Sequence, residues 1–388
     1  MPTGTKGIAI TGIGLALPEH QLEQHETSAR LAEALAGQPD AARWARRVFR
    51  QNGVETRYTC EPNLLAEPAQ CRYFPTTDKA APAPTTSERM RIYKRESVPL
   101  ALTAARTALL ESGSLPSEIT HLITVSCTGQ FLPGLDAELT WQLGLKPAVQ
   151  RLPLQFLGCG AGLKAIGLAR QITASQPGAR ALVVCVELCT LHIQPSGQRE
   201  ALYGASFFGD GASACVITEA VGQGGVGHFL LDEPYSTLLP DSADQMAWEL
   251  GDHGFDLYLS PEVPRLIARH IPGELDRMLG GKLPDWWAVH PGGKGIVDAV
   301  QQTFHLQDEQ VAPSRNVLRR YGNLSSATIL FVLEELRRTL NDSTSAEQQS
   351  GLAVAFGPGL TFEMLRMSYV PQAATLHAVD EQAGVVRA

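Results

Sequence analysis

Apolar positions along the chain alternate between short runs typical of buried strands and longer stretches with helical spacing. The short runs are rich in Val, Ile, Leu and Ala, and several end at Gly or Pro. They cover Ile8–Ile13, His121–Cys127, Ala181–Glu187, Ala212–Thr218, Trp286–His290 and Leu352–Phe356. Helical spacing marks Val98–Ser112, Leu135–Leu143, Gly162–Ala174, Val263–His270 and Ser325–Leu340. This alternation predicts an α/β fold with largely buried sheets.

The pattern divides near the middle of the chain. A glycine-dense stretch at Gly222–Gly227 follows a predicted strand, and the order of strands and helices before it is coarsely repeated after it. We therefore predict two units, residues 1–220 and 221–388. Residues Ala66–Arg91, rich in Pro and Ala, are expected to form a long surface excursion. The tail after Tyr369 has no strong period, so we expect it to be loose.

Composition and charge narrow the class of protein. The 388 residues are 44% hydrophobic and 19% charged, which allows a large core. A formal net charge of -8 argues against a nucleic-acid binder, although Arg43, Arg46, Arg47 and Arg50 form a candidate basic patch with Arg57. The seven cysteines lack zinc-type spacing and indicate reduced thiols. No apolar run approaches the ~18 residues that a membrane helix needs, so we expect a cytoplasmic protein without a membrane span.

Three residues carry the candidate chemistry. Cys159 lies in the sequence LGCGAG just before a predicted helix, where the helix dipole and a nearby imidazolium would favour its thiolate. His290 ends a predicted strand before Pro-Gly-Gly, which leaves room for a bulky ligand. Asn323 precedes a predicted helix that Ser325 can cap, so its amide can point outward as a donor. Attack on a thioester followed by carbon–carbon bond formation needs a nucleophile and hydrogen-bond donors that stabilise an oxyanion or an enolate. Cys159 suits the first role, and His290 and Asn323 suit the second.

The other cysteines have a simpler interpretation. Cys185, Cys189 and Cys215 lie within or beside apolar runs and are expected to pack in the core. Cys127 ends a predicted strand beside a turn. It is therefore either a cavity residue or a small buried hydrophobe.

Four motifs follow one another along the chain. They are GCGAG around Cys159, HPGG at His290, YGNLSSA at Tyr321–Ala327 and AFGPGLTFE at Ala355–Glu363. In this order they resemble the type III polyketide synthases of the chalcone synthase superfamily, and the bacterial members, similar to alkylpyrone and alkylresorcinol synthases, look closer than the plant ones. The resemblance implies a thiolase-type, five-layered fold made of two similar halves, acting as a homodimer on coenzyme A thioesters.

The resemblance also assigns roles to single residues. Cys159 would hold the acyl chain, while His290 and Asn323 would promote malonyl decarboxylation and stabilise the enolate. Phe208, in FFGDG, matches the gatekeeper aromatic between the coenzyme A tunnel and the cavity. Leu132, just before Pro-Gly, matches the position that reaches across the dimer into the neighbour's cavity.

Further positions match the family's substrate-contacting regions or depart from them. Arg47 and its neighbours match, loosely, the basic patch that meets the coenzyme A phosphates. His192 stands where the plant cavity has a small polar residue, and it could be a cavity wall, a proton carrier or a core histidine. Glycine-rich segments near the three candidate residues allow the backbone or a ligand to approach them closely. They are Gly292 and Gly293 after His290, and the loop of Gly357, Pro358 and Gly359.

The implied reaction loads an acyl-CoA starter on Cys159, extends it by repeated decarboxylative condensation with malonyl-CoA, and cyclises the chain to a pyrone or resorcinol-type product. No metal or redox cofactor is implied. The expected starter is a medium or long fatty acyl group, with a malonyl starter as the main alternative. Two other functions stay open: a single condensation by a β-ketoacyl carrier-protein synthase of the initiating kind, and thioester hydrolysis by a Cys/His/Asn hydrolase.

Overall fold

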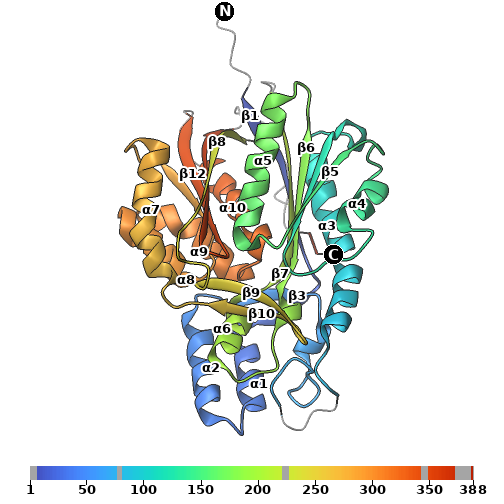
Figure 1. The fold of residues 1–388 in the computed structure, drawn as a ribbon, viewed down its shortest axis with the longest axis vertical. Helices are drawn as coiled ribbons and strands as arrows, with labels where there is room; N and C mark the ends of the chain where they lie inside the picture. Colours follow the sequence, from blue (N-terminus) through green and yellow to red (C-terminus); the bar gives the residue numbers. More distant parts are fainter. Residues whose placement is uncertain (1–6, 77–80, 221–226, 342–347, 372–385, 388) are drawn as a thin grey trace, which may run out of the picture.

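The computed structural model describes residues 7–76, 81–220, 227–341, 348–371 and 386–387. Its main sheet follows the hydrogen-bonded order β11-β12-β13-β8-β1-β7-β6-β4-β5, with β14 beside β1 (Figure 1). The strands are β1 (Ile8–Leu17), β4 (His121–Ser126), β5 (Gln150–Gln155), β6 (Ala181–Leu188), β7 (Asp210–Glu219), β8 (His228–Leu238), β11 (Trp286–Val289), β12 (Gln349–Gly357), β13 (Thr361–Val370) and β14 (Val386–Arg387). The antiparallel pairing of β1 with β8 joins the strands of the N-terminal half to those of the C-terminal half.

The fold has five layers, and three buried apolar clusters pack them together. The central cluster contacts both parts of the sheet, and each of the other two lies under an outer layer of helices. The first packs α3 (Thr86–Glu111) and α4 (Leu135–Leu143) against β4, β6 and β7. The second packs α5 (Ala161–Ser175) and α10 (Thr328–Asn341) between the two parts of the sheet. The third packs α7 (Val263–Leu279) and α8 (Lys294–Phe304) against β11, β12 and β13. Figure 1 shows α5 and α10 in the middle, and this helix–sheet–helix–sheet–helix order confirms the predicted α/β layering.

The predicted strands are continuous apolar runs because both of their faces are covered. Successive side chains of a strand point to opposite faces. In β6, Val183 and Cys185 belong to the central cluster, whereas Leu182 and Val184 belong to the outer cluster under α3. A strand covered on both faces shows no alternation of polar and apolar residues.

Smaller elements cover the end of the molecule where α5 and α10 begin. Helices α1 (Gln24–Ala34), α2 (Pro39–Gln51) and α6 (Arg199–Phe207) pack on one another, as Figure 1 shows at its lower edge. Strands β9 (Met246–Gly251) and β10 (Gly254–Leu259) form a hairpin that pairs with no other described strand. The remaining elements are α9 (Asp308–Tyr321), β2 (His20–Glu23) and β3 (Thr56–Thr59).

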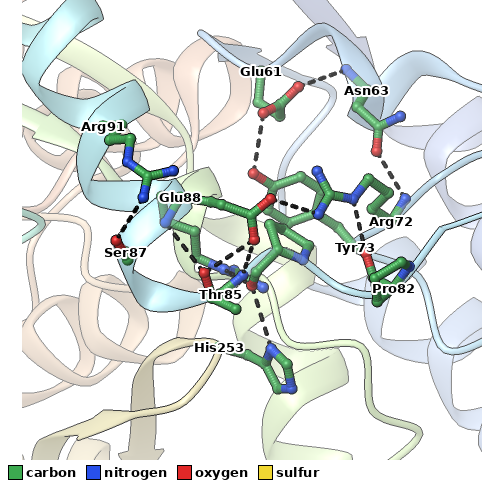
Figure 2. Close-up of polar contacts among 12 residues, drawn as sticks. Glu61, Asn63, Arg72, Tyr73, Pro82, Thr85, Ser87, Glu88, Arg91 and His253 are labelled. Atoms are coloured by element: carbon green, nitrogen blue, oxygen red, sulfur yellow. Dashed lines mark hydrogen bonds and ion pairs between the residues drawn. The ribbon is translucent and has the colours of Figure 1, made fainter.

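The predicted surface excursion at Ala66–Arg91 is wrong in its last part, because α3 begins at Thr86. Thr85 and Glu88 form a capping box at this helix start, which Figure 2 shows together with the ion pair from Arg72 to Glu88. Arg89, one turn on, is fully buried and donates to the carbonyls of Leu191 and Ile193. Arg89 therefore belongs to the protein interior, although it lies in the stretch that was predicted to be a surface excursion.

Two other expectations lie largely outside the described residues. The glycine-dense boundary falls on residues 221–226 for all but its last glycine, and the tail after Tyr369 falls on residues 372–385 and 388. Among the described helices, none is both long enough and apolar enough to cross a membrane.

Candidate active site

Cys159 lies at the start of the first central helix. It belongs to the short turn η3 (Gly158–Gly160), which runs directly into α5. Gly158 has a φ of +67°, and a Cβ atom there would stand 2.2 Å from Cδ of Pro358. A Cβ on Gly357 would stand 3.1 Å from the carbonyl oxygen of Leu157. The Gly-Pro-Gly loop therefore packs closely against the cysteine loop, and a side chain at Gly158 would clash with Pro358.

Asn323 lies just before the second central helix, which follows the short turn η5 (Ser325–Ala327). The backbone N–H of Ser325 donates to Oδ1 of Asn323 at 2.8 Å. This bond fixes the amide, so that Nδ2 donates to the carbonyl of Gly292 at 3.3 Å and lies 3.8 Å from Sγ of Cys159. The asparagine thus presents a donor to the cysteine.

His290 follows β11, and its backbone N–H donates to the carbonyl of Val354 at 2.8 Å. The residue is 1% exposed, and neither ring nitrogen has a hydrogen-bond partner within the described parts of the chain. Buried polar groups are nearly always hydrogen-bonded, so an exception calls for an explanation. His290 lines a cavity, so its ring nitrogens are available to a molecule that enters it.

One small cavity of about 30 Å³ brings these three residues together. It is also lined by the predicted residues Phe208, Gly292 and Pro358. The other lining residues are Gly158, Phe207, Met246, Trp248, Leu257, Leu259, Ile296 and Phe356. All of these other residues are apolar or glycine, so Cys159, His290 and Asn323 face a poorly solvated space.

Two larger cavities share walls with the first. A cavity of about 450 Å³ shares Leu257, Leu259, Gly292 and Ile296 with it and is also lined by Gly293, Trp44 and Arg199. A cavity of about 200 Å³ shares Phe208, Trp248 and Leu257 with it and is also lined by Cys189 and His192. The cavity lined by Cys159, His290 and Asn323, called the candidate catalytic cavity below, therefore adjoins both larger cavities.

The comparison with known proteins identifies the family. Residues 3–220 match the N-terminal domain of chalcone and stilbene synthases, and residues 231–371 match the C-terminal domain of the same enzymes. The chain belongs to the chalcone and stilbene synthase family. It is 35% identical over 371 residues to type III polyketide synthase 21 of Oryza sativa subsp. japonica, covering 91% of this chain and 92% of the rice protein.

Solved structures of type III polyketide synthases have the same fold. PKS-I from the brown alga Ectocarpus siliculosus matches with a TM-score of 0.86 and 27% identity, over 96% of this chain and 100% of the other. The C-terminal type III domain of Steely1, a type I/III hybrid from Dictyostelium, matches with a TM-score of 0.83 and 24% identity, over 94% and 99%. The synthase therefore has the thiolase-type fold and is an acyltransferase of the type III polyketide class.

Burial is the main influence on the pKa values of Cys159 and His290 in this synthase. Burial raises the pKa of the Cys159 thiol to about 11, while hydrogen bonds from Ser325 and Asn323 act to lower it. Burial also lowers the pKa of His290 to about 3. The expectation that the helix start favours the Cys159 thiolate is thus outweighed by desolvation when each group is taken alone.

A buried carboxyl group lies beneath the cysteine and was missed from the sequence. Glu187, in β6, accepts from Oγ1 of Thr128 at 2.7 Å, from the backbone N–H of Cys127 at 3.1 Å and from the Ser326 hydroxyl. Burial raises the pKa of this carboxyl group. A glutamate at the end of an otherwise apolar strand was the available signal, since such a group is rarely buried without partners.

Cys127 takes part in that network and does not line the candidate catalytic cavity. Its Sγ lies 3.1 Å from Oγ of Ser325 and 3.5 Å from Oε1 of Glu187. Because Ser325 also bonds to Cys159, the two cysteines share one hydroxyl group. Of the remaining cysteines, Cys185 and Cys215 are fully buried as predicted.

Phe208 is positioned by contacts from distant parts of the chain. It forms an isolated β-bridge with Asn323, and the N–H of Asn323 donates to the carbonyl of Phe207 at 2.8 Å. The guanidinium group of Arg57 donates to the carbonyls of Ala205 and Phe208, each at 2.8 Å. Arg57 is 0% exposed, so its predicted place in a surface basic patch is wrong.

His192 and Cys189 both line the cavity of about 200 Å³. Nε2 of His192 donates to the carbonyl of Thr128 at 2.7 Å, and Nδ1 accepts from the N–H of Phe255 at 3.1 Å. Both ring nitrogens are therefore engaged, and burial lowers the pKa of His192 to about 3. His192 is a neutral wall residue. Cys189 is 3% exposed and packs in an apolar cluster, as predicted, and it also lines this cavity.

Four predicted positions do not line any of the three cavities: Arg47, Leu132, Gly357 and Gly359. Arg47, on α2, is exposed and bonds to Gln51 at 3.2 Å, while Trp44 and Val48 of the same helix line the cavity of about 450 Å³. Leu132 is 92% exposed. Gly359 has a φ of +63°, which accounts for the glycine at the end of its loop.

Proposed function

We propose that the synthase loads an acyl-CoA starter on Cys159, extends it repeatedly with malonyl-CoA, and cyclises the product to a pyrone or resorcinol-type ring. The observation that carries this proposal is the convergence of Cys159, His290 and Asn323 on one apolar cavity, with both ring nitrogens of His290 unpaired among the described residues. The starter that we propose is a medium or long fatty acyl group.

In the loading step, His290 accepts the thiol proton of Cys159. The thiolate then attacks the carbonyl carbon of the acyl-CoA, and the carbon–sulfur bond to coenzyme A breaks. The coenzyme A thiolate leaves with the proton that His290 held. Hydrogen bonds from Asn323 and Ser325 to the sulfur favour the thiolate during this exchange.

In the extension step, malonyl-CoA loses carbon dioxide, and the electron pair of the broken bond forms the enolate of acetyl-CoA. In this step, Nδ2 of Asn323 and a ring N–H of neutral His290 donate hydrogen bonds to the enolate oxygen. The enolate carbon attacks the acyl thioester, and Cys159 leaves as its thiolate. No metal or redox cofactor enters this cycle.

In this proposal coenzyme A binds in the cavity of about 450 Å³, which is lined by Gly292 and Gly293. Arg199 lies in its wall, with its guanidinium carbon 5.1 Å from the ring centre of Trp44. Arg47, exposed on the neighbouring α2 surface, is available to the coenzyme A phosphates. Phe208 would then separate this side from the cavity behind it.

A homodimer is part of the proposal. Leu132, 92% exposed, is an apolar side chain that a partner subunit would cover. Strand β5 is the last strand of the main sheet and has a described neighbour on one side only. An unpaired edge of this kind favours pairing with a second copy. Sedimentation equilibrium tests this assembly, and a single-chain mass at micromolar concentration would refute it.

The experiment that tests the function compares the wild type with Cys159→Ala. Each is incubated with labelled malonyl-CoA and with starters from acetyl-CoA to palmitoyl-CoA, and the products are resolved by mass. We expect products heavier than the starter by several ketide units, and none from the variant. Free fatty acid alone would indicate a hydrolase, and one added ketide unit would indicate the single-condensation synthase; either result would overturn the proposal.

A further inference from the structure

The last residue of the motif AFGPGLTFE packs against the loop that carries Cys159. This residue, Glu363, lies in β13 and is 7% exposed. A Cβ built on Gly160 would stand 3.2 Å from Cγ of Glu363. Because Gly160 directly follows Cys159, the Glu363 side chain lies against the backbone beside the candidate nucleophile.

The carboxylate of Glu363 also binds the beginning of α5. Its Oε1 accepts from Nζ of Lys164 at 2.9 Å and from Oγ of Ser236 at 2.8 Å. Nζ of Lys164 donates to Oγ of Ser236 as well, at 2.9 Å. Ser236 stands opposite Glu363 in the antiparallel pairing of β8 with β13. The three side chains thus join α5 to two strands of the main sheet.

The start of α5 lacks the local stabilisation that helices usually have. A capping side chain or an acidic residue normally satisfies the free N–H groups and the positive end of the helix dipole. Here the N-cap residue is Gly160, no side chain caps the helix, and its first turn holds no acidic residue. Glu363 supplies the missing negative charge from another strand. Lys164 balances that charge, so the pair adds no net charge near Cys159.

The burial of Glu363 distinguishes this ion pair from ordinary surface pairs. Exposed pairs contribute little, because water and salt screen them. The Lys164 side chain is 42% exposed, but that of Glu363 is only 9% exposed. A buried carboxylate that lost its cation would still carry its desolvation cost. The pair is therefore a fixed connection between α5 and β13.

We propose that the ion pair of Lys164 and Glu363 positions Cys159 for acyl transfer, by holding the first turn of α5 against β13. This inference rests on the proposed function. Both are positioning residues, because neither lines the candidate catalytic cavity. His290 and Asn323 lie on other elements, after β11 and before η5. The pair therefore acts on acyl loading and not on malonyl decarboxylation.

The test follows two reactions in the same variants. Loading is the rate at which palmitoyl-CoA forms the acyl-enzyme at Cys159, by intact-protein mass, and decarboxylation is the rate at which malonyl-CoA gives acetyl-CoA. Lys164→Met keeps the stem of the side chain and removes its charge. We expect loading to slow by about 10–10²-fold, because misplacing a reacting group by ~1 Å has an effect of that size. Decarboxylation should stay at the wild-type rate, and Lys164→Arg, which keeps the pair, should load normally.

Arg170→Met is the matched control. Arg170 also lies in α5 and also pairs with β8, through Glu233 at 2.5 Å, but it is further along the helix from Cys159. Its loss should leave loading unchanged. The double variant Lys164→Met with Glu363→Gln leaves no unpaired buried charge, so it serves if the single variant does not fold. It is expected to load as slowly as Lys164→Met.

Three results would overturn the inference. The double variant could load at the wild-type rate, decarboxylation could fall in step with loading, or Arg170→Met could lose as much loading as Lys164→Met. A wild type that loads acyl groups but never extends them would refute polyketide synthesis and leave the inference standing.

A wild type that loads no acyl-CoA would refute the proposed function, and alkylation of Cys159 by iodoacetamide then decides the inference. Cys159 is partly exposed, whereas the other six cysteines are buried. We expect slower alkylation in the double variant, because the hydrogen bonds from Ser325 and Asn323 that favour the thiolate depend on where the sulfur lies. Equal alkylation rates in the double variant and the wild type would overturn the inference.

Discussion

At the scale of single residues, the orientation of the Asn323 amide decides what the side chain can do. Oδ1 accepts the N–H of Ser325, so the NH₂ group faces Cys159 and the carbonyl of Gly292. Without the Ser325 bond the amide could turn and present its oxygen to the sulfur. The local turn η5 therefore determines that the site holds a donor at this point.

Asn323→Asp keeps the bond to Ser325 and replaces the NH₂ group by an oxygen. Because the enolate loses one donor, we expect decarboxylation of malonyl-CoA to fall by about 10²–10³-fold. The rate is measured as acetyl-CoA formed from malonyl-CoA. Asn323→Ala, which removes both the donor and the Ser325 contact, should be at least as slow. If the aspartate variant decarboxylates at the wild-type rate, Asn323 acts only through its contact to Ser325.

The sequence was sufficient to find three candidate residues that the fold brings to one cavity, and insufficient for the residues that surround them. Cys159, His290 and Asn323 could be predicted because each lies in a short motif with glycine or a helix start beside it. Arg57 and Trp248 could not, since their roles depend on contacts with residues far away in the chain. Arg57 meets the carbonyl of Phe208 across a sequence separation of 151 residues. No local pattern distinguishes such an arginine from one on the surface.

At the scale of elements, two helix starts touch beneath the site. A Cβ built on Gly162, in the first turn of α5, would stand 2.1 Å from the carbonyl oxygen of Ser326 in η5. This is closer than any non-bonded contact allows. The small residue at Gly162 therefore sets the distance between the helix that carries Cys159 and the turn that follows Asn323.

Gly162→Ala forces these two elements apart, and overpacking of this kind costs about 1–3 kcal/mol. We expect a lower unfolding midpoint and a loss of condensing activity, measured by thermal melting and product formation. Gly273→Ala is the matched control, because Gly273 also lies in a helix, α7, and nothing stands within 4 Å of its added Cβ. This control should be stabilised by up to about 1 kcal/mol. Equal melting temperatures for the two variants would contradict the close contact.

Some helices and strands were predicted accurately, whereas others were missed or were predicted too short. Helix α4 was predicted with its observed bounds, Leu135–Leu143, and the central strands of the sheet were found within a few residues. Strand β8 was missed, because it contains Asp232, Glu233 and Pro234 and alternates between buried and partly exposed positions. Helix α3 was predicted too short, since the polar residues of its first turns are covered by contacts from elsewhere in the chain.

At the scale of the whole molecule, buried neutral histidines make stability depend on pH. The pKa of His192 is about 3 in the folded protein, against roughly 6.5 in an unfolded chain. Above pH 6.5 the residue is neutral in both states and contributes no pH dependence. As the pH falls from 6.5 towards 3, only the unfolded chain binds the proton, so stability decreases. His290 acts in the same direction, with a pKa of about 3.

His192→Gln keeps a donor for Thr128 and an acceptor for Phe255 but has no proton to gain. We expect the fall in unfolding free energy between pH 6.5 and pH 4.5 to be shallower in this variant, by up to about 1.4 kcal/mol per pH unit. Urea unfolding at several pH values measures it. Asp210 works in the opposite direction, because burial raises its pKa to about 6, and its effect cancels in the comparison of the two proteins. Parallel pH profiles would show that His192 is charged in the folded state or reaches solvent.

The separate hairpin of β9 and β10 bears on the evolution of this enzyme. It supplies Trp248 and Leu257 to the lining of both the cavity at Cys159 and the cavity of about 200 Å³, yet it pairs with no described strand of the main sheet. Cys159, His290 and Asn323 come instead from elements next to the central helices and the main sheet. Mutations that reshape the hairpin can therefore alter which molecules are made while the bond-forming steps are inherited intact. Exchanging this one segment between relatives is a direct way to diversify the products of the scaffold.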